Sequence, residues 1–275
     1  MSHNPSAQMD QKEDSLTSPS TESRINALQW LFDALATGGR EPIITPDDWQ
    51  GYFTQQPGMR QTSITRWFLA ALRYEWRAPE PPTPLCGALT GDVRAYLESR
   101  EGPWATVWGH IQRVAGNALW LARRGDINLE AVYLAVLFHD AGKLDEWDAG
   151  RPHAELGAEM AGRALRGKLP PGTLKTIDDA IRIHPDRPPS SWKVACALHD
   201  ADKLDKVGAA GLIRRLSAAE NHADACLGAY RTLDEAEAFP ALALPASEAL
   251  LRPKIAFVRT LEELIDGVCE EEARG

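Results

Sequence analysis

The 275-residue sequence predicts an all-α fold: a helical bundle preceded by a small N-terminal helical extension. Two observations support this prediction. From residue 91 onward, apolar side chains recur three and four positions apart, the spacing that places them on one face of a helix. No run of four or more residues there alternates apolar and polar side chains between turn signals, as a half-buried strand does. Helices of this kind bury their apolar faces by packing on one another.

The part of the chain before residue 91 divides into three segments by composition. Residues 1–23 are rich in Ser, Thr, Gln and Pro and are predicted to be a disordered tail. Residues 24–78 are predicted to be the helical extension, and residues 79–90 a proline-rich linker. The extension carries Trp beside Arg, a combination that also suits the stacking of single-stranded bases. Packing between helices is the favoured interpretation, because aromatic residues dominate protein cores.

The main domain is predicted to span residues 91–240. Residues 241–275 are predicted to form a C-terminal helix that packs on the core. Its apolar face could instead contact a partner. The helices are expected at residues 91–100, 104–124, 129–140, 153–167, 173–184, 191–206, 209–231 and 248–270.

Composition excludes several classes of protein. A net charge of -9 and a pI near 5.3 argue against a broad basic surface for duplex nucleic acid, although a local phosphate pocket remains possible. The longest apolar run, Ala131 to Phe138, is too short to span a bilayer, and the N-terminus has no apolar signal segment. A cytoplasmic protein without membrane contact is therefore expected. The cysteines are scattered, which predicts reduced structural thiols: Cys86, Cys196, Cys226 and Cys269.

Histidines on the apolar faces of successive helices indicate a metal site. One histidine on such a face is usually a hydrogen-bonded core residue. Five of them, accompanied by inward-facing aspartates, favour a bound ion, because buried carboxylates without partners are costly. Mixed nitrogen and oxygen ligands suit one or two ions of Mn, Fe, Co, Ni or Zn. Such ions can activate water to hydroxide near neutral pH. The residues concerned are His110, His139, His153, His184, His199, Asp140 and Asp202.

The adjacent pair His139-Asp140 is predicted to lie in the last turn of a helix, with Gly142 as the helix stop. The carbonyl end of a helix favours a nearby cation. Consecutive residues at a helix end can also converge on one ion more easily than residues in mid-helix, which diverge by about 100°.

The ordered motifs of the chain resemble the HD-domain metal-dependent phosphohydrolases over roughly residues 100–216. The resemblance rests on His110, His139-Asp140-Ala-Gly-Lys143, His153-Ala-Glu-Leu-Gly-Ala158, Ile183-His184 and Ala201-Asp202-Lys-Leu-Asp205. It implies an HD-domain-like helical bundle in which a primary metal is held by His110, His139, Asp140 and Asp202. It also implies that His153 and His184 bind a second metal or the substrate phosphate, and that Lys143 contacts phosphate or assists the leaving group.

Four further residues are candidates, two of them for supporting the metal ligands and two for binding phosphate. Asp205 is expected to brace the turn at Gly208 or to support the metal ligands. His199 is weighed between such a supporting role and simple packing. Arg187 and Arg214 could each bind a substrate phosphate bidentately.

The sequence therefore predicts a metal-dependent phosphohydrolase that acts on a nucleotide or other small phosphorylated compound. Asp140 and Lys143 are the predicted catalytic residues, with metal-activated hydroxide as the nucleophile. A phosphodiesterase or nuclease acting on cyclic or single-stranded substrates is one alternative. An effector-binding domain that retains the fold without catalysis is the other.

Overall fold

The structure is a computed structural model that describes residues 79–217 and 242–260. These residues are 72% helical and contain no strand, which confirms the all-α fold class. The predicted tail and N-terminal extension lie outside them. The helices are α4 (Pro84–Glu98), α5 (Trp104–Arg124), α6 (Leu129–His139), α7 (Glu146–Ala149), α8 (His153–Leu165), α9 (Pro171–Ile183), α10 (Lys193–Leu204) and α11 (Gly208–Ser217), followed by the 3-10 turn η1 (Pro245–Ser247) and helical residues 248–260.

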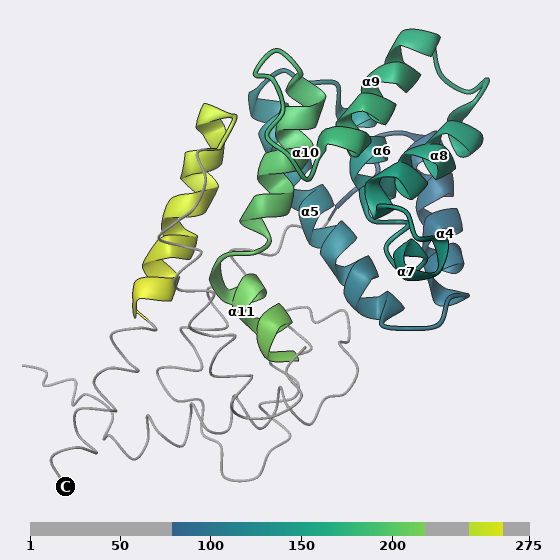
Figure 1. Cartoon of the computed structure of the whole chain (residues 1–275). Helices are drawn as coiled ribbons and strands as arrows, with labels where there is room; N and C mark the ends of the chain where they lie inside the picture. The colour runs from purple at the N-terminus through teal and green to yellow at the C-terminus, as the bar shows by residue number, and fades with distance from the viewer. Residues whose placement is uncertain (1–78, 218–241, 261–275) are drawn as a thin grey trace, which may run out of the picture.

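Helix α6 lies at the centre of the bundle because its sequence is apolar on every side. All of its residues from Ala131 to His139 are buried. Helices α4, α5, α8, α9 and α10 pack around it (Figure 1). A helix without a polar face is stable only when neighbours cover it completely. This central position places the C-terminal end of α6, with its polar residues, inside the bundle.

The first described helix begins earlier than the sequence indicates. Helix α4 starts at Pro84, within the stretch predicted as a linker. The Thr83 side chain caps it by accepting a hydrogen bond from the Cys86 N–H at 3.3 Å. Proline is well suited to the first turn, where its missing N–H costs no helical hydrogen bond. Because Cys86 and Leu89 are buried in the main core, the linker prediction is wrong for the second half of residues 79–90.

Two glycines allow the end of α6 to approach α8 closely. A Cβ atom on Gly157 would lie 2.2 Å from the carbonyl oxygen of Phe138, and one on Gly142 would lie 2.5 Å from the Cβ of Leu156. Helix α6 already ends at His139, and Gly142 does not have a positive φ. The predicted role of Gly142 as a helix stop is therefore wrong. Close packing against α8 is what requires a glycine there.

The C-terminal segment is attached to α10 through Asp200. This fully buried carboxylate accepts hydrogen bonds from the N–H groups of Ala243 and Leu244, at 2.9 and 2.8 Å, and from Ser247 Oγ at 2.6 Å. Leu250 and Phe257, in the helical residues that follow, belong to the same hydrophobic cluster as α5 and α6. Residues 242–260 therefore pack on the bundle.

Within the described residues, no helix is both long enough and apolar enough to cross a bilayer. Cys86 and Cys196 are buried free thiols, in agreement with the prediction. Cys226 and Cys269 lie outside the described residues.

Candidate metal centre

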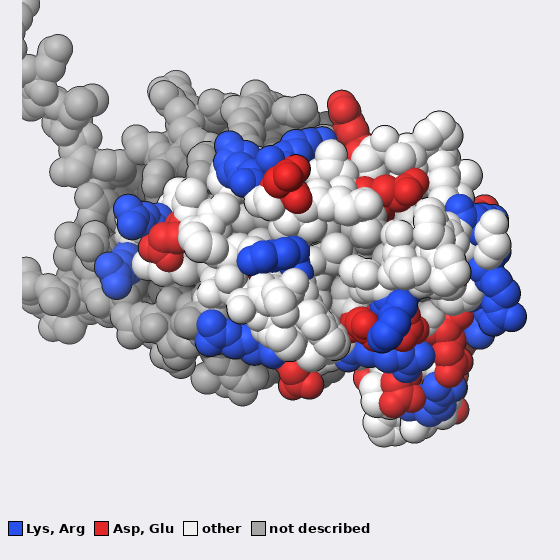
Figure 2. All heavy atoms as spheres, turned by 90° about the horizontal axis from the view of Figure 1, so that it is seen from above, with Lys and Arg blue, Asp and Glu red and all other residues white. Residues whose placement is uncertain are grey.

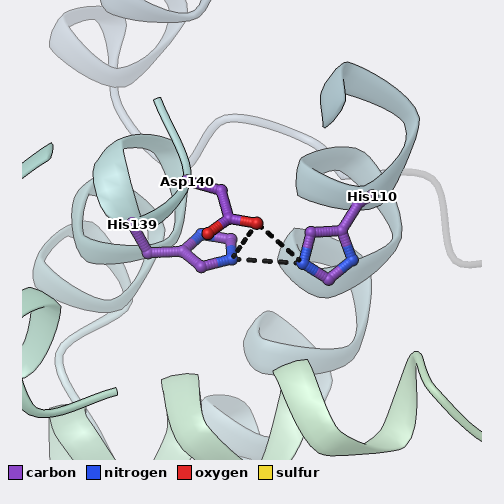
Figure 3. A group of neighbouring side chains, drawn as sticks. All are labelled: His110, His139 and Asp140. Carbon is purple, nitrogen blue, oxygen red and sulfur yellow. Dashed lines mark hydrogen bonds and ion pairs between the residues drawn. The ribbon is translucent and has the colours of Figure 1, made fainter. Parts of the chain in front are cut away.

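Six polar side chains from five helices meet next to the end of α6. All six are residues that the sequence predicts to hold a metal or a phosphate. They are His110 of α5, His139 at the end of α6, Asp140 as the C-cap of α6, His153 at the start of α8, His184 as the C-cap of α9, and Asp202 of α10. Figure 3 shows His110 and His139 facing one another, with Asp140 beside them. Segments far apart in the sequence thus converge on one place.

The carboxylate of Asp140 lies between two pairs of histidines. Its Oδ2 is 3.5 Å from Nε2 of His110 and 3.9 Å from Nε2 of His139. Its Oδ1 is 3.3 Å from Nε2 of His153 and 3.8 Å from Nε2 of His184. Asp140 thus belongs to two groups of possible metal ligands, the first with His110 and His139 and the second with His153 and His184. Within each group the possible ligand atoms lie within 4.8 Å of one another. This is close to the spread of ligand atoms around a single ion at about 2.1 Å, so Asp140 could serve one ion with each pair.

Backbone carbonyls orient two of the four imidazoles. Nδ1 of His139 donates to the carbonyl of Val136, and Nδ1 of His184 donates to the carbonyl of Ile181, both at 2.6 Å. A carbonyl oxygen only accepts hydrogen bonds, so Nδ1 carries the hydrogen in each ring. In the neutral rings Nε2 is therefore a free lone pair that points into the site. Burial favours the neutral form and lowers the pKa of His184 to about 3.

Carboxylates orient the other two imidazoles. Nδ1 of His110 lies 2.7 Å from Asp205 Oδ2, and Nδ1 of His153 lies 2.9 Å from Glu146 Oε1. A carboxylate on the far nitrogen fixes the tautomer of a metal-binding histidine and makes it a stronger ligand. All four rings therefore present Nε2 to the carboxylate of Asp140.

The contacts between these nitrogens fit bound divalent ions. Nε2 of His139 is 3.3 Å from Nε2 of His110, and Nε2 of His153 is 3.4 Å from Nε2 of His184. Two lone pairs at this distance repel each other unless a proton or a metal ion lies between them. Burial acts against a charged His110, but its bonds to Asp202 and Asp205 outweigh burial and raise its pKa to about 9. The site therefore attracts a cation, and its imidazole and carboxylate donors suit a transition metal.

Asp202 connects this site to two lysines that sequence reasoning missed. Its Oδ1 lies 3.3 Å from Nε2 of His110, and its Oδ2 accepts a hydrogen bond from Lys206 Nζ at 3.0 Å. Lys203 Nζ lies 3.7 Å from the same Oδ2 and donates to the carbonyl of Pro185 at 3.5 Å. Burial and the charge of Lys206 lower the pKa of Lys203. The spacing of four residues between Asp202 and Lys206 is the signal that could have revealed their contact.

Asp205 lies behind His110 instead of bracing the turn at Gly208. Its carboxylate is buried, and it also accepts hydrogen bonds from Arg113, at 2.8 and 3.2 Å. Arg214 belongs to the same cluster, because its guanidinium lies 3.7 Å from Asp205 Oδ2 and 3.2 Å from Nδ1 of His110. The Nδ1 atom faces away from the ligand side of the ring. Arg214 thus supports His110 from behind and does not extend toward a substrate on the Nε2 side.

Lys143 lies at the rim of the site beside His153. Its Nζ donates to Glu146 Oε2 at 3.0 Å and lies 3.1 Å from Nδ1 of His153. The side chain is 42% exposed, so it can reach solvent. Burial acts against ionisation of Glu146, but the bonds from His153 and Lys143 prevail and lower its pKa to about 2. Sequence reasoning missed Glu146. Its spacing of three residues from Lys143 could have indicated that ion pair, but nothing in the sequence predicts its contact with His153.

The two remaining candidates, His199 and Arg187, make no described contact with the six clustered side chains. Nδ1 of His199 is 3.0 Å from Oδ1 of Asp200, and among the described residues no hydrogen bond or ion pair links His199 to the six. The packing role is therefore the one that the structure favours for His199. Arg187 is exposed in the loop after α9, and no hydrogen bond or ion pair joins it to a described site residue.

Comparison with known families identifies the segment that contains all six candidate ligands. Residues 107–207 match the family model of the HD domain. This segment is an HD domain. Among solved structures, a predicted HD superfamily hydrolase from an uncultured Thermotogales bacterium is 24% identical, with a TM-score of 0.51 over 66% of this chain and 91% of that one. The likeness supports the same fold.

A second solved structure is more distant. Bacillus subtilis YpgQ in complex with ADP is 17% identical, with a TM-score of 0.49 over 66% of this chain and 96% of that one. The search of curated proteins gave no match. The HD domain and the two groups of ligand atoms together support a metal-dependent HD-type hydrolase in general.

Proposed function

We propose that the chain is a metal-dependent phosphohydrolase that cleaves a phosphoester or phosphoanhydride bond of a nucleotide or another small phosphorylated compound. The observation that carries this proposal is the carboxylate of Asp140 between two pairs of imidazole Nε2 atoms. Ions held there would activate water as a nucleophile near neutral pH and withdraw charge from the phosphoryl oxygens. Cleavage of a phosphoester or phosphoanhydride uses both effects.

Each ligand has a defined part in this proposal. His110, His139, Asp140 and Asp202 would hold the first ion. His153 and His184 would hold a second ion together with Asp140, which would be shared. Val136, Ile181 and the carboxylates behind His110 and His153 keep the rings in position before any substrate arrives, and such preorganisation lowers the cost of reaching the transition state.

Lysines on two sides of the ligand cluster would bind the phosphate. Lys143 lies beside His153, and Lys203 and Lys206 lie beside Asp202. Lys203 and Lys206 share the single carboxylate of Asp202, whose other oxygen faces His110, so the described groups leave positive charge on this edge uncompensated. A substrate phosphate would compensate it. These lysines replace Arg187 and Arg214 as the candidates for phosphate contact.

The surface favours a small substrate. The face in Figure 2 carries basic and acidic side chains interspersed with uncharged ones, and the part of it that the structure describes has no extended basic area. Together with the net charge of -9 this argues against a long nucleic acid duplex as substrate.

A phosphodiesterase that acts on a cyclic or single-stranded substrate is the second candidate. The complete second group, Asp140 with His153 and His184, favours it. Two ions can stabilise both the attacking and the leaving oxygen of a phosphodiester.

One experiment distinguishes these functions. Purified protein would be analysed for bound metals and assayed with a nucleoside triphosphate, a phosphomonoester, a cyclic dinucleotide and a single-stranded oligonucleotide, alongside His139→Ala and Asp140→Ala. Hydrolysis of the small phosphates that both variants abolish is the expected result. Preference for the diesters would support the second candidate. If the wild type binds no metal and hydrolyses none of the substrates, the proposal is refuted, and a non-catalytic effector-binding domain is the remaining interpretation.

A further inference from the structure

The four imidazoles of the HD domain differ in what holds them. His139 and His184 donate to carbonyls of their own helices, three residues earlier. Nδ1 of His110 faces Asp205, whose side chain is 1% exposed and which also bonds Arg113. His153 is the exception among these four rings, because Nδ1 of His153 is held by Glu146 at the rim of the site. The Glu146 side chain is 37% exposed and belongs to the four-residue helix α7. The orientation of His153 thus depends on a residue that the rest of the bundle does not enclose.

Among the described residues, Glu146 accepts three hydrogen bonds, which come from His153 and from the neighbouring Lys143. Oε1 accepts from Nδ1 of His153 at 2.9 Å and from the backbone N–H of His153 at 3.2 Å. Oε2 accepts from Lys143 Nζ at 3.0 Å. One carboxylate therefore sets the tautomer of the ring, fixes the first turn of α8 and holds the nearest lysine.

The charge of Glu146 matters in addition to its position. Lys143 Nζ lies 3.1 Å from Nδ1 of His153. An ammonium so close to the ring opposes a second cation at Nε2. The carboxylate of Glu146 compensates that charge and holds the ring with Nε2 toward the site, and both effects favour an ion at Nε2.

We propose that Glu146 is a positioning residue for the second ion, which it favours by orienting His153 and by neutralising Lys143. This inference rests on the proposed metal centre. Glu146 would not touch the ion or the substrate, and the first ion, held by His110 and His139, would not depend on it. The expected effect is therefore selective for one of two ions.

The test is a titration of the metal-free protein with Mn²⁺. Calorimetry measures each binding event, and electron paramagnetic resonance detects the signal of coupled Mn²⁺ pairs. Glu146→Gln keeps an acceptor for Nδ1 but removes the charge, and Glu146→Ala removes both. We expect Glu146→Gln to weaken one binding event about tenfold and Glu146→Ala about a hundredfold, with loss of the coupled signal, while the other event stays within about twofold. His153→Ala should abolish the same event.

Glu159→Gln is the matched control. Glu159 lies on α8, its side chain is 40% exposed, and it pairs with Arg151 instead of a ligand. Circular dichroism would verify that each variant is folded. The inference is overturned if both Glu146 variants bind Mn²⁺ like Glu159→Gln, or if they weaken both events equally. A wild type that binds a single Mn²⁺ also overturns it but leaves the first ion intact, and one that binds none refutes the proposed function as well.

Discussion

The substitution Gly157→Ala gives the most direct test of how the contact between α6 and α8 positions the candidate metal centre. The added Cβ would lie 2.2 Å from the carbonyl oxygen of Phe138, whereas ordinary contacts begin at 3.4 Å. The other atoms near it are also backbone, including the carbonyl oxygen of His139 at 3.1 Å, so no flexible side chain can move away. The two helices must therefore separate by about 1 Å. Overpacking of this kind typically costs 1–3 kcal/mol of stability.

The same displacement would disrupt the ligands. His153 begins α8 and Asp140 follows α6, and their ligand atoms are 3.3 Å apart. A misplacement of about 1 Å in an active site can lower activity about a hundredfold. We expect Gly157→Ala to lose about 2 kcal/mol in urea unfolding and to retain fewer metal ions per chain.

Gly162→Ala is the control, because it places the same methyl group on the same helix, where nothing lies within 4 Å. That variant should be unchanged or slightly more stable, by roughly 0.5–1 kcal/mol, since alanine favours a helix over glycine. If Gly157→Ala unfolds like Gly162→Ala and binds as much metal, close packing of α6 on α8 does not position the site.

Three further predictions concern residues around the centre. Asp205→Asn should weaken the ion at His110 by ten- to a hundredfold, because the ring loses its carboxylate partner, and a Mn²⁺ titration measures this. Lys206→Ala should raise the KM for a phosphate substrate about tenfold in steady-state assays, because one charge-assisted contact to phosphate is lost. Asp200→Ala should lower the free energy of unfolding by roughly 3 kcal/mol in urea, because three donors, two of them buried, lose their acceptor.

Each of these predictions has an outcome that would contradict it. Metal affinity of Asp205→Asn equal to that of the wild type would show that the carboxylate does not support His110. Lys175→Ala is the control for Lys206→Ala, because it removes an exposed lysine that is paired with Asp179 on α9. If the two variants have equal KM values, Lys206 does not contact the phosphate. Unaltered stability of Asp200→Ala would show that residues 242–260 are held on the bundle by other contacts.

The sequence predicted the bounds of individual helices accurately where their apolar pattern is strong. The prediction of a helix at residues 104–124 coincides with α5, and that at 129–140 differs from α6 by one residue. These helices have clear apolar periodicity or a continuous apolar run, and local spacing suffices to detect either. The start of α4 was missed because prolines indicate either a linker or a first helical turn. The burial of Cys86 decides between the two, and burial is a tertiary property.

Contacts between helices could be predicted from the sequence only where several histidines and aspartates lie on successive helices. The sequence by itself determined that His110, His139, His153 and His184 lie on helices with Asp140 and Asp202, because residue type and helical spacing are local. Only the tertiary structure decided which carboxylate lies between which imidazoles. It also decided that Glu146 contacts His153, Asp205 contacts His110 and Lys206 contacts Asp202. The reason is physical: hydrogen bonds between segments depend on how helices pack, and the packing of α6 against α8 is set by close contacts at Gly142 and Gly157 that leave no periodic signal.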